Sequence, residues 1–64
     1  MNTFHRNDEV ITPDGRGHIQ EIVGPNLYRV MITRDRFHGV LPLHFTEKSP
    51  TVSQNYESEE LSNV

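Results

Sequence analysis

Apolar and polar residues alternate along the middle of the chain with the period of two that is typical of a β-strand. The clearest case is the segment 27–33. Its residues Tyr28, Val30 and Ile32 would share one face of a strand, and the residues between them would share the other. No segment shows the period of 3.6 residues that predicts a helix. The pattern therefore predicts an all-β fold.

Three further β-rich runs flank this segment, at 9–12, 18–23 and 37–41. Turn signals separate the runs: Pro-Asp-Gly at 13–15, Gly-Pro-Asn at 24–26 and Arg-Asp-Arg at 34–36. Short strands at intervals of about 8–12 residues with turns between them are typical of a sandwich or a small barrel. We therefore predict a small barrel of about five strands over residues 7–49, after a flexible N-terminus at 1–6. A single 3₁₀ turn is expected near Leu43 to Phe45.

The corner that follows the first run contains Gly15, Arg16 and Gly17. A nucleotide-binding loop needs further glycines in register before a helix, or a Gly-Lys-Ser/Thr sequence, and a β-type run follows here instead. The two glycines therefore predict backbone roles, one adopting a positive φ and the other allowing close approach of two strands. Ile19 and Ile22 are three residues apart, so a bulge between them is needed if both face the core.

The segment from Pro50 to Val64 is polar and acidic, with only scattered apolar residues. Such a composition buries too little apolar surface to offset the entropy lost on ordering. We therefore expect a disordered acidic tail over residues 50–64, with at most a nascent helical turn near 57–61.

The net charge of −3 is unevenly distributed along the chain. All six bases lie at or before Lys48, where six of the nine acids balance them, and the other three acids are Glu57, Glu59 and Glu60. A neutral domain with an acidic tail is a poor electrostatic match for a nucleic-acid duplex. A protein is therefore the expected partner, and nucleic acid is the less favoured one.

The chain has 64 residues and no cysteine, which leaves room for one small core and excludes disulfides and Cys-ligated zinc. It has no apolar run of the length needed for a signal peptide or a membrane span, so we expect a cytoplasmic protein. The serines of the expected tail cannot form a rigid catalytic triad, and the four histidines lack the spacing of a metal site. We predict no catalytic residues, no bound metal and no cofactor.

Five short motifs follow one another along the chain: Asn-Asp-Glu-Val at 7–10, Pro-Asp-Gly-Arg-Gly at 13–17, Ile-Gln-Glu-Ile at 19–22, Tyr-Arg-Val-Met-Ile at 28–32 and Leu-Pro-Leu-His-Phe at 41–45. In these motifs the chain resembles, over about residues 6–48, the RNA-polymerase-interacting domain of CarD-type transcription regulators and the transcription-repair coupling factor. Asn7 stands where that domain usually has Gly. The resemblance implies an SH3-like or Tudor-like barrel that contacts RNA polymerase.

The Asp-x-Val opening and the Gly-x-Gly-x-Ile corner are also similar to the KOW-type modules of ribosomal proteins and elongation factors. That second resemblance implies contact with nucleic acid through Arg16, Arg34 and Arg36. An accessory subunit of a larger enzyme assembly is a third alternative.

A protein-interaction module is the function that the sequence favours. Arginine and aromatic side chains are enriched at interfaces, and the candidate partner-binding residues are Arg16, Tyr28, Arg29, Arg34, Arg36 and Phe37. Leu27 and Met31 would join them if their face of the strand is open. The alternative is that the N-terminal segment or a second copy of the chain covers that face.

Overall fold

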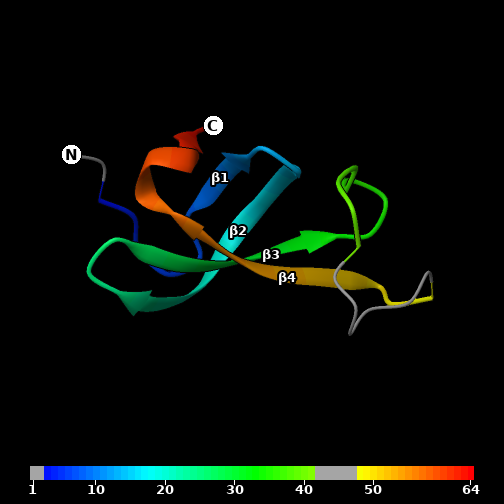
Figure 1. Ribbon diagram of the computed structural model, residues 1–64, viewed down its shortest axis with the longest axis horizontal. Helices are drawn as coiled ribbons and strands as arrows, with labels where there is room; N and C mark the ends of the chain where they lie inside the picture. The colour runs from blue at the N-terminus through cyan, green and yellow to red at the C-terminus, as the bar shows by residue number, and fades with distance from the viewer. Residues whose placement is uncertain (1–2, 42–47) are drawn as a thin grey trace.

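The computed structural model describes residues 3–41 and 48–64, and these residues form one antiparallel sheet of five strands (Figure 1). The elements are β1 (Glu9–Thr12), β2 (Gly15–Gly24), β3 (Leu27–Thr33), β4 (Thr51–Glu57), the 3₁₀ helix η1 (Ser58–Glu60) and β5 (Ser62–Asn63). The strand order is β4-β3-β2-β1-β5. The all-β prediction is confirmed.

The first four strands form a meander in which each strand pairs with the next. η1 then carries the chain back across the molecule, so that β5 pairs with the free side of β1. In Figure 1 the C-terminus consequently lies beside β1, far along the sheet from β4. Residues from both ends of the chain thus complete the same sheet.

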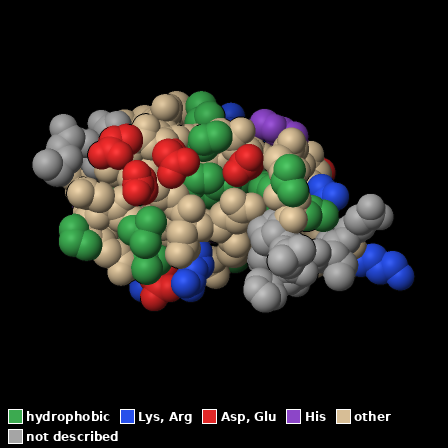
Figure 2. All heavy atoms as spheres, in the orientation of Figure 1, with side chains coloured by type: hydrophobic (Ala, Val, Ile, Leu, Met, Phe, Trp, Pro, Cys, Tyr) green, Lys and Arg blue, Asp and Glu red, His purple; other side chains and the backbone are tan. Residues whose placement is uncertain are grey.

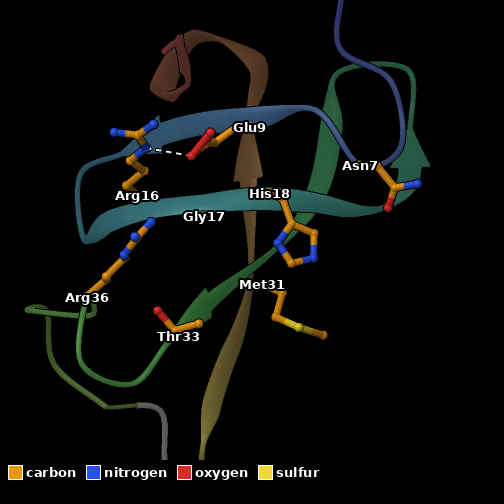
Figure 3. Close-up of a pocket in the computed structure, with 8 residues that line it drawn as sticks. All are labelled: Asn7, Glu9, Arg16, Gly17, His18, Met31, Thr33 and Arg36. Atoms are coloured by element: carbon orange, nitrogen blue, oxygen red, sulfur yellow. Dashed lines mark hydrogen bonds and ion pairs between the residues drawn. The ribbon is translucent and has the colours of Figure 1, made fainter.

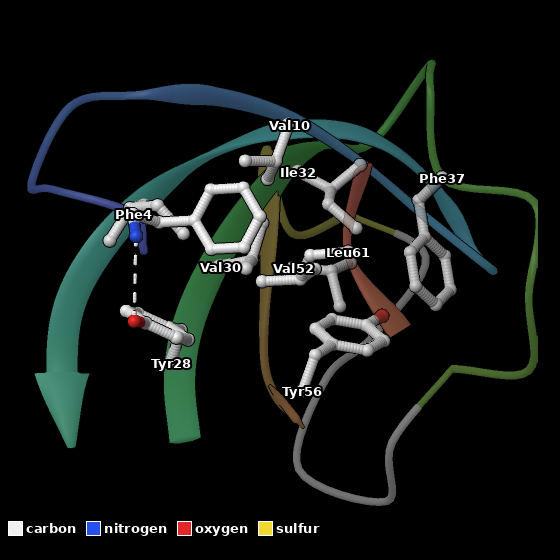
Figure 4. Packing of buried hydrophobic residues seen from close by; sticks show 10 residues of the cluster. Phe4, Val10, Tyr28, Val30, Ile32, Phe37, Val52, Tyr56 and Leu61 are labelled. Carbon is white, nitrogen blue, oxygen red and sulfur yellow. Dashed lines mark hydrogen bonds between the residues drawn. The ribbon is translucent and has the colours of Figure 1, made fainter. Parts of the chain in front are cut away.

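Among the described residues, a cluster of ten buried side chains forms the core (Figure 4). Its members are Phe4, Val10, Ile19, Tyr28, Val30, Ile32, Phe37, Val52, Tyr56 and Leu61. The predicted face of β3 is confirmed, because its three apolar residues are all in this cluster. The rings of Phe4 and Tyr28 pack edge to face at 5.5 Å, a favourable geometry for an aromatic pair.

The predicted bulge in β2 is confirmed by a register shift between Ile19 and Glu21. After the shift Ile22 pairs with Tyr28, a core residue, so Ile22 and Ile19 are on the same side of the sheet. Ile19 is fully buried, but Ile22 is 49% exposed. The prediction that both residues lie inside is therefore wrong for Ile22, because it sits at the end of the β2–β3 hairpin, where less of the core covers it.

Both glycines of the β1–β2 corner have the predicted backbone roles. Gly15 has a φ of +138°, which L side chains rarely adopt. A Cβ at Gly17 would overlap the carbonyl oxygen of Met31 on β3. The turn is closed by Thr12, whose hydroxyl donates to the Gly15 carbonyl at 2.7 Å and accepts from the Asp14 amide at 3.0 Å.

The predicted strand at 37–41 is wrong. The segment 34–36 is a turn in which the amides of Arg36 and Phe37 both donate to the Thr33 carbonyl, at 2.9 and 3.0 Å. These local hydrogen bonds fold the chain back and direct the Phe37 ring into the core instead of continuing a ladder. The 3₁₀ turn expected at Leu43 to Phe45 lies outside the described residues.

The predicted disorder of the C-terminal segment is also wrong. β4 pairs with β3 over seven residues, and Val52, Tyr56 and Leu61 are core residues. Composition underestimated this segment because its few apolar residues fall at core positions, and because β3, distant in sequence, satisfies its backbone hydrogen bonds. The nascent turn expected near 57–61 corresponds to η1, which begins with a reciprocal capping box between Glu57 and Glu60.

The N-terminal segment is likewise part of the folded unit. Phe4 is buried, and the Asn7 amide donates to the Ile19 carbonyl at 2.8 Å. The predicted flexible N-terminus is therefore wrong at Phe4, whose ring packs in the core. The polar residues around Phe4 in the sequence gave no indication of this contact. The core therefore contains residues from the predicted N-terminal segment, from the predicted barrel and from the predicted tail.

Candidate functional site

An open groove crosses the outer face of β1, β2 and β3, on the side of the sheet away from the core (Figure 3). Eight residues line it: Asn7, Glu9, Arg16, Gly17, His18, Met31, Thr33 and Arg36. Strand pairing brings them together, since Glu9 is opposite His18 on β2 and His18 is opposite Met31 on β3. We call this surface the outer groove.

A charged pair stands at the β1 side of the outer groove. The Arg16 Nε donates to the Glu9 carboxylate at 2.7 Å, with each side chain 47% exposed. This hydrogen bond holds the pKa of Glu9 below its ordinary value of 4.5, with smaller contributions from the charges of Arg16, Arg36 and His18. The pair thus fixes the position of a carboxylate that faces solvent.

Arg36 stands on the other side of the outer groove, in the turn after β3. Among the described residues it has no ion pair and no side-chain hydrogen bond. Its side chain is exposed and extends toward Gly17 and Arg16 in Figure 3. Two guanidinium groups from distant parts of the sequence therefore flank one surface, and Arg36 retains the full donor set of its planar fork.

The middle of the outer groove is less polar. Met31 and His18 are partly buried neighbours on adjacent strands, and Gly17 presents only backbone there. A flexible, polarisable thioether adapts to differently shaped partners. At the N-terminal end Asn7 has a φ of +73°, the left-handed conformation in which Gly and Asn are favoured.

The outer groove contains two of the six predicted partner-binding residues, Arg16 and Arg36. Tyr28 and Phe37 are 4% and 5% exposed and lie in the core, so their rings have no free face for a partner.

The other two predicted residues lie apart from the groove. Arg29 donates to Glu21 at 2.9 Å and to the Asn55 side chain at 3.4 Å, which holds it over β2 and β4. Arg34 is partly buried, and its Nε has no hydrogen-bond partner among the described residues.

Five residues of the outer groove were not candidates from sequence: Asn7, Glu9, Gly17, His18 and Thr33. A signal for Glu9 and His18 was available in the hairpin pattern, because residues that flank a tight turn at equal distances pair across it. Applying this rule to the turn at 13–14 would have placed Glu9 opposite His18 and near Arg16. Met31 was a conditional candidate, and its face of β3 is open.

Within residues 3–41 and 48–64 there is no group of three or more His, Cys, Asp or Glu side chains with the geometry to hold a metal ion. The same residues contain no helix of the length and apolarity needed to cross a membrane.

The comparisons with known proteins found no matching family model, no matching curated protein and no matching solved structure. What the outer groove does must therefore be argued from its own residues.

Proposed function

We propose that this chain is a non-catalytic protein-interaction module, a small SH3-like barrel that docks on a larger complex through the outer groove. The observation that carries the proposal is the meeting of Arg16 and Arg36 around the half-buried Met31 on a face that the core does not use. Arginine and methionine are both enriched at protein interfaces relative to other surfaces.

The geometry suits recognition of a polypeptide. The free fork of Arg36 matches a carboxylate, with which it would make paired hydrogen bonds. The carboxylate of Glu9, held in place by Arg16, would accept a hydrogen bond from a partner N–H group. Met31 and His18 between them offer apolar contact. Because most of these groups stand on paired strands, little backbone conformational entropy is lost when a partner binds.

The resemblance to the RNA-polymerase-interacting domain supports a polymerase subunit in the cytoplasm as the partner. Two features of the fold agree with that resemblance: the return of the last strand to β1, which an SH3-like barrel requires, and the left-handed Asn7 at the position of the family's Gly. Fold resemblance alone does not assign a partner, so the outer groove remains the basis of the proposal.

A KOW-like nucleic-acid module is the alternative that Arg16 and Arg36 favour, since both could contact phosphates. Against it, the Glu9 carboxylate lies in the same groove, and the chain carries a net charge of −3. An accessory subunit of an enzyme assembly would use the same groove for a protein partner.

The test is an affinity pulldown from cell lysate with the tagged chain, with and without nuclease and at low and high salt. We expect a nuclease-resistant protein to be retained by wild type and by Arg29→Ala, which removes an arginine outside the groove. We expect the Arg36→Ala and Met31→Ala variants to retain much less of this protein. Retention that nuclease or moderate salt abolishes would instead support nucleic-acid binding, because phosphate contacts are strongly salt-dependent. Equal retention by all variants would exclude the outer groove.

A further inference from the structure

The two edges of the sheet differ in length and regularity. β4 has seven residues and pairs with β3 over its whole length without a register shift. The opposite edge is β5, which has two residues. Very short edge strands offer few backbone groups to another chain, whereas a long regular edge is a template for pairing. The β4 edge is therefore the one that can extend the sheet.

The register shows which backbone groups of β4 point away from β3. The amide of Ser58 donates to the Asn26 carbonyl and the amide of Arg34 donates to the Pro50 carbonyl, each at 2.9 Å. Hydrogen-bonded pairs alternate along an antiparallel ladder, so the even-numbered residues of β4 bond to β3. The amides and carbonyls of Thr51, Ser53 and Asn55 consequently point outward.

The β4 edge also lacks the features by which natural sheets avoid edge-to-edge pairing. Such features are lysine, proline, bulges and inward-pointing charges on the edge strand. The sequence Thr-Val-Ser-Gln-Asn-Tyr-Glu contains neither lysine nor proline, and its pairing with β3 has no bulge. The side chains that accompany the outward backbone groups are small or uncharged: Thr51, Ser53 and Asn55. Nothing in this stretch repels an approaching strand.

We propose that two copies of this chain associate by antiparallel pairing of their β4 edges, with the two-fold axis at Ser53. In this register Ser53 is opposite Ser53 of the other copy, and Thr51 is opposite Asn55. Each such pair exchanges two backbone hydrogen bonds. The register uses all three outward-pointing residues and leaves out Glu57, whose amide already donates to the Glu60 carboxylate at 3.0 Å.

Electrostatics favours this antiparallel arrangement over a parallel one. The acidic side chains Glu57, Glu59 and Glu60 all lie at one end of β4 and on η1, and acidic side chains gather over that end of the molecule in Figure 2. Antiparallel pairing about Ser53 puts the two copies of Glu57 at opposite ends of the joint, about 25 Å apart along the strands. This exceeds the screening length of about 8 Å at physiological ionic strength. Parallel pairing would bring the two acidic ends together.

A second copy fits this edge better than an unrelated strand because the register is self-complementary. The three outward-pointing residues form only uncharged pairs of Thr, Ser or Asn, which can hydrogen-bond across the strands. The joint would make one continuous sheet from two molecules. The outer groove involves β1, β2 and β3 and would remain free in the pair.

Sedimentation velocity on the purified chain, from about 1 μM to about 1 mM, tests the proposal in the range of weak association. We expect the apparent mass of wild type to rise toward twice the monomer value with concentration. Asn55→Pro removes an outward amide and adds a ring at the edge without removing a backbone hydrogen bond to β3, so it should remain monomeric. Asn55→Ala, the matched control, loses the same contact with Arg29 and should associate like wild type.

A second pair of variants protects the test against misfolding of the proline variant. Ser53→Lys places two lysines opposite each other at the axis and should weaken association by about tenfold or more, since like charges opposite each other are destabilising. Val23→Lys adds the same charge at an exposed position on β2 and should have no effect. Equal association of both lysine variants with wild type would overturn the proposal.

Amide hydrogen exchange locates the contact. We expect the amides of Ser53 and Asn55 to exchange fast in dilute solution and to become protected as concentration rises, while those of Gln54 and Tyr56 are protected throughout. A wild type that stays monomeric at every concentration, or outward amides that are protected already in dilute solution, would refute the pairing. Loss of the pulldown partner in Asn55→Pro without any self-association would assign the edge to a foreign strand instead. The sedimentation and exchange measurements do not depend on the outer groove, so they test the β4 pairing even if the outer-groove variants keep the pulldown partner.

Discussion

The two faces of the sheet carry opposite kinds of side chain although they belong to the same strands. On β3, Val30 is fully buried while its neighbours Arg29 and Met31 face outward. The inner face joins segments from Phe4 to Leu61 into one core. On the outer face, Arg16 and Arg36 flank the outer groove, whose lining includes no core residue. Adjacent residues of one strand thus differ in burial: the inner face contributes to the core, and the outer face stays in contact with solvent.

Removal of the C-terminal segment is the strongest test of the inner face. A chain that ends at Ser49 loses β4, β5 and the core residues Val52, Tyr56 and Leu61. We expect it to be unfolded, because the loss exceeds the total stability of a small domain, which is about 5 kcal/mol at the low end. Circular dichroism and amide dispersion in NMR spectra would show this. Removing only the exposed Val64 is the control and should leave the fold intact. Cooperative unfolding of the shortened chain would contradict a core shared across the sequence.

Gly17→Ala tests how closely β2 and β3 approach each other. The new Cβ would overlap the Met31 carbonyl and press on the Ile32 side chain. We expect a loss of about 1–3 kcal/mol in the free energy of unfolding, as for other overpacked cores. In the matched control Gly24→Ala, the nearest atom to the new Cβ is the Leu27 Cβ at an ordinary 3.7 Å. Urea unfolding of both variants gives the comparison, and equal losses would show that close approach is unimportant.

Tyr56→Phe tests a polar link at the margin of the core. The Tyr56 hydroxyl donates to the Asp14 carboxylate at 2.7 Å and thereby ties β4 to the β1–β2 turn. We expect a loss of about 1–2 kcal/mol, since a hydrogen bond to a charged group is removed. The control Tyr28→Phe should lose less, because the Tyr28 hydroxyl only accepts a long 3.5 Å bond from the Phe4 amide.

The same hydroxyl predicts a dependence on alkaline pH. Burial, and then the hydrogen bond to Asp14, raise the pKa of Tyr56 above its ordinary value of 10.0. A group whose pKa is raised by folding contributes its full stabilisation below its unfolded pKa, and the contribution declines as pH rises beyond it. Wild type should therefore lose more stability than Tyr56→Phe above pH 10.0. Parallel stability curves for the two chains in that range would refute the link.

The smallest effect is expected on the outer face. Arg16→Ala removes the hydrogen bond that lowers the pKa of Glu9, so that pKa should rise toward its ordinary value of 4.5. An NMR titration of the Glu9 carboxylate measures the change, and Arg29→Ala, which affects a different acid, is the control. Unfolding by urea should be nearly unchanged, because exposed ion pairs contribute little to stability. A large loss of stability in Arg16→Ala would remove the distinction between the faces.

The candidate site was predictable only in part. Arg16 and Arg36 were both candidates from sequence, but nothing in the sequence brought them to one surface, because their meeting depends on the β2–β3 register and on the turn at 34–36. Tyr28 and Phe37 are of a residue type that is enriched at binding surfaces, but they lie in the core. An aromatic side chain fits either place, and only the packing around it decides which.

The sequence by itself determined the local features of this protein: the alternating face of β3, the turn at 13–14 and the positive φ of Gly15. Each depends on residues close together in the chain, whose sterics and hydrogen bonds restrict the backbone directly. Only the tertiary structure decided that the segment after Pro50 is a strand and that the segment at 37–41 is not. A strand exists through its partner, and the pairing of β4 with β3 and of β5 with β1 joins residues too far apart for any local pattern to reveal.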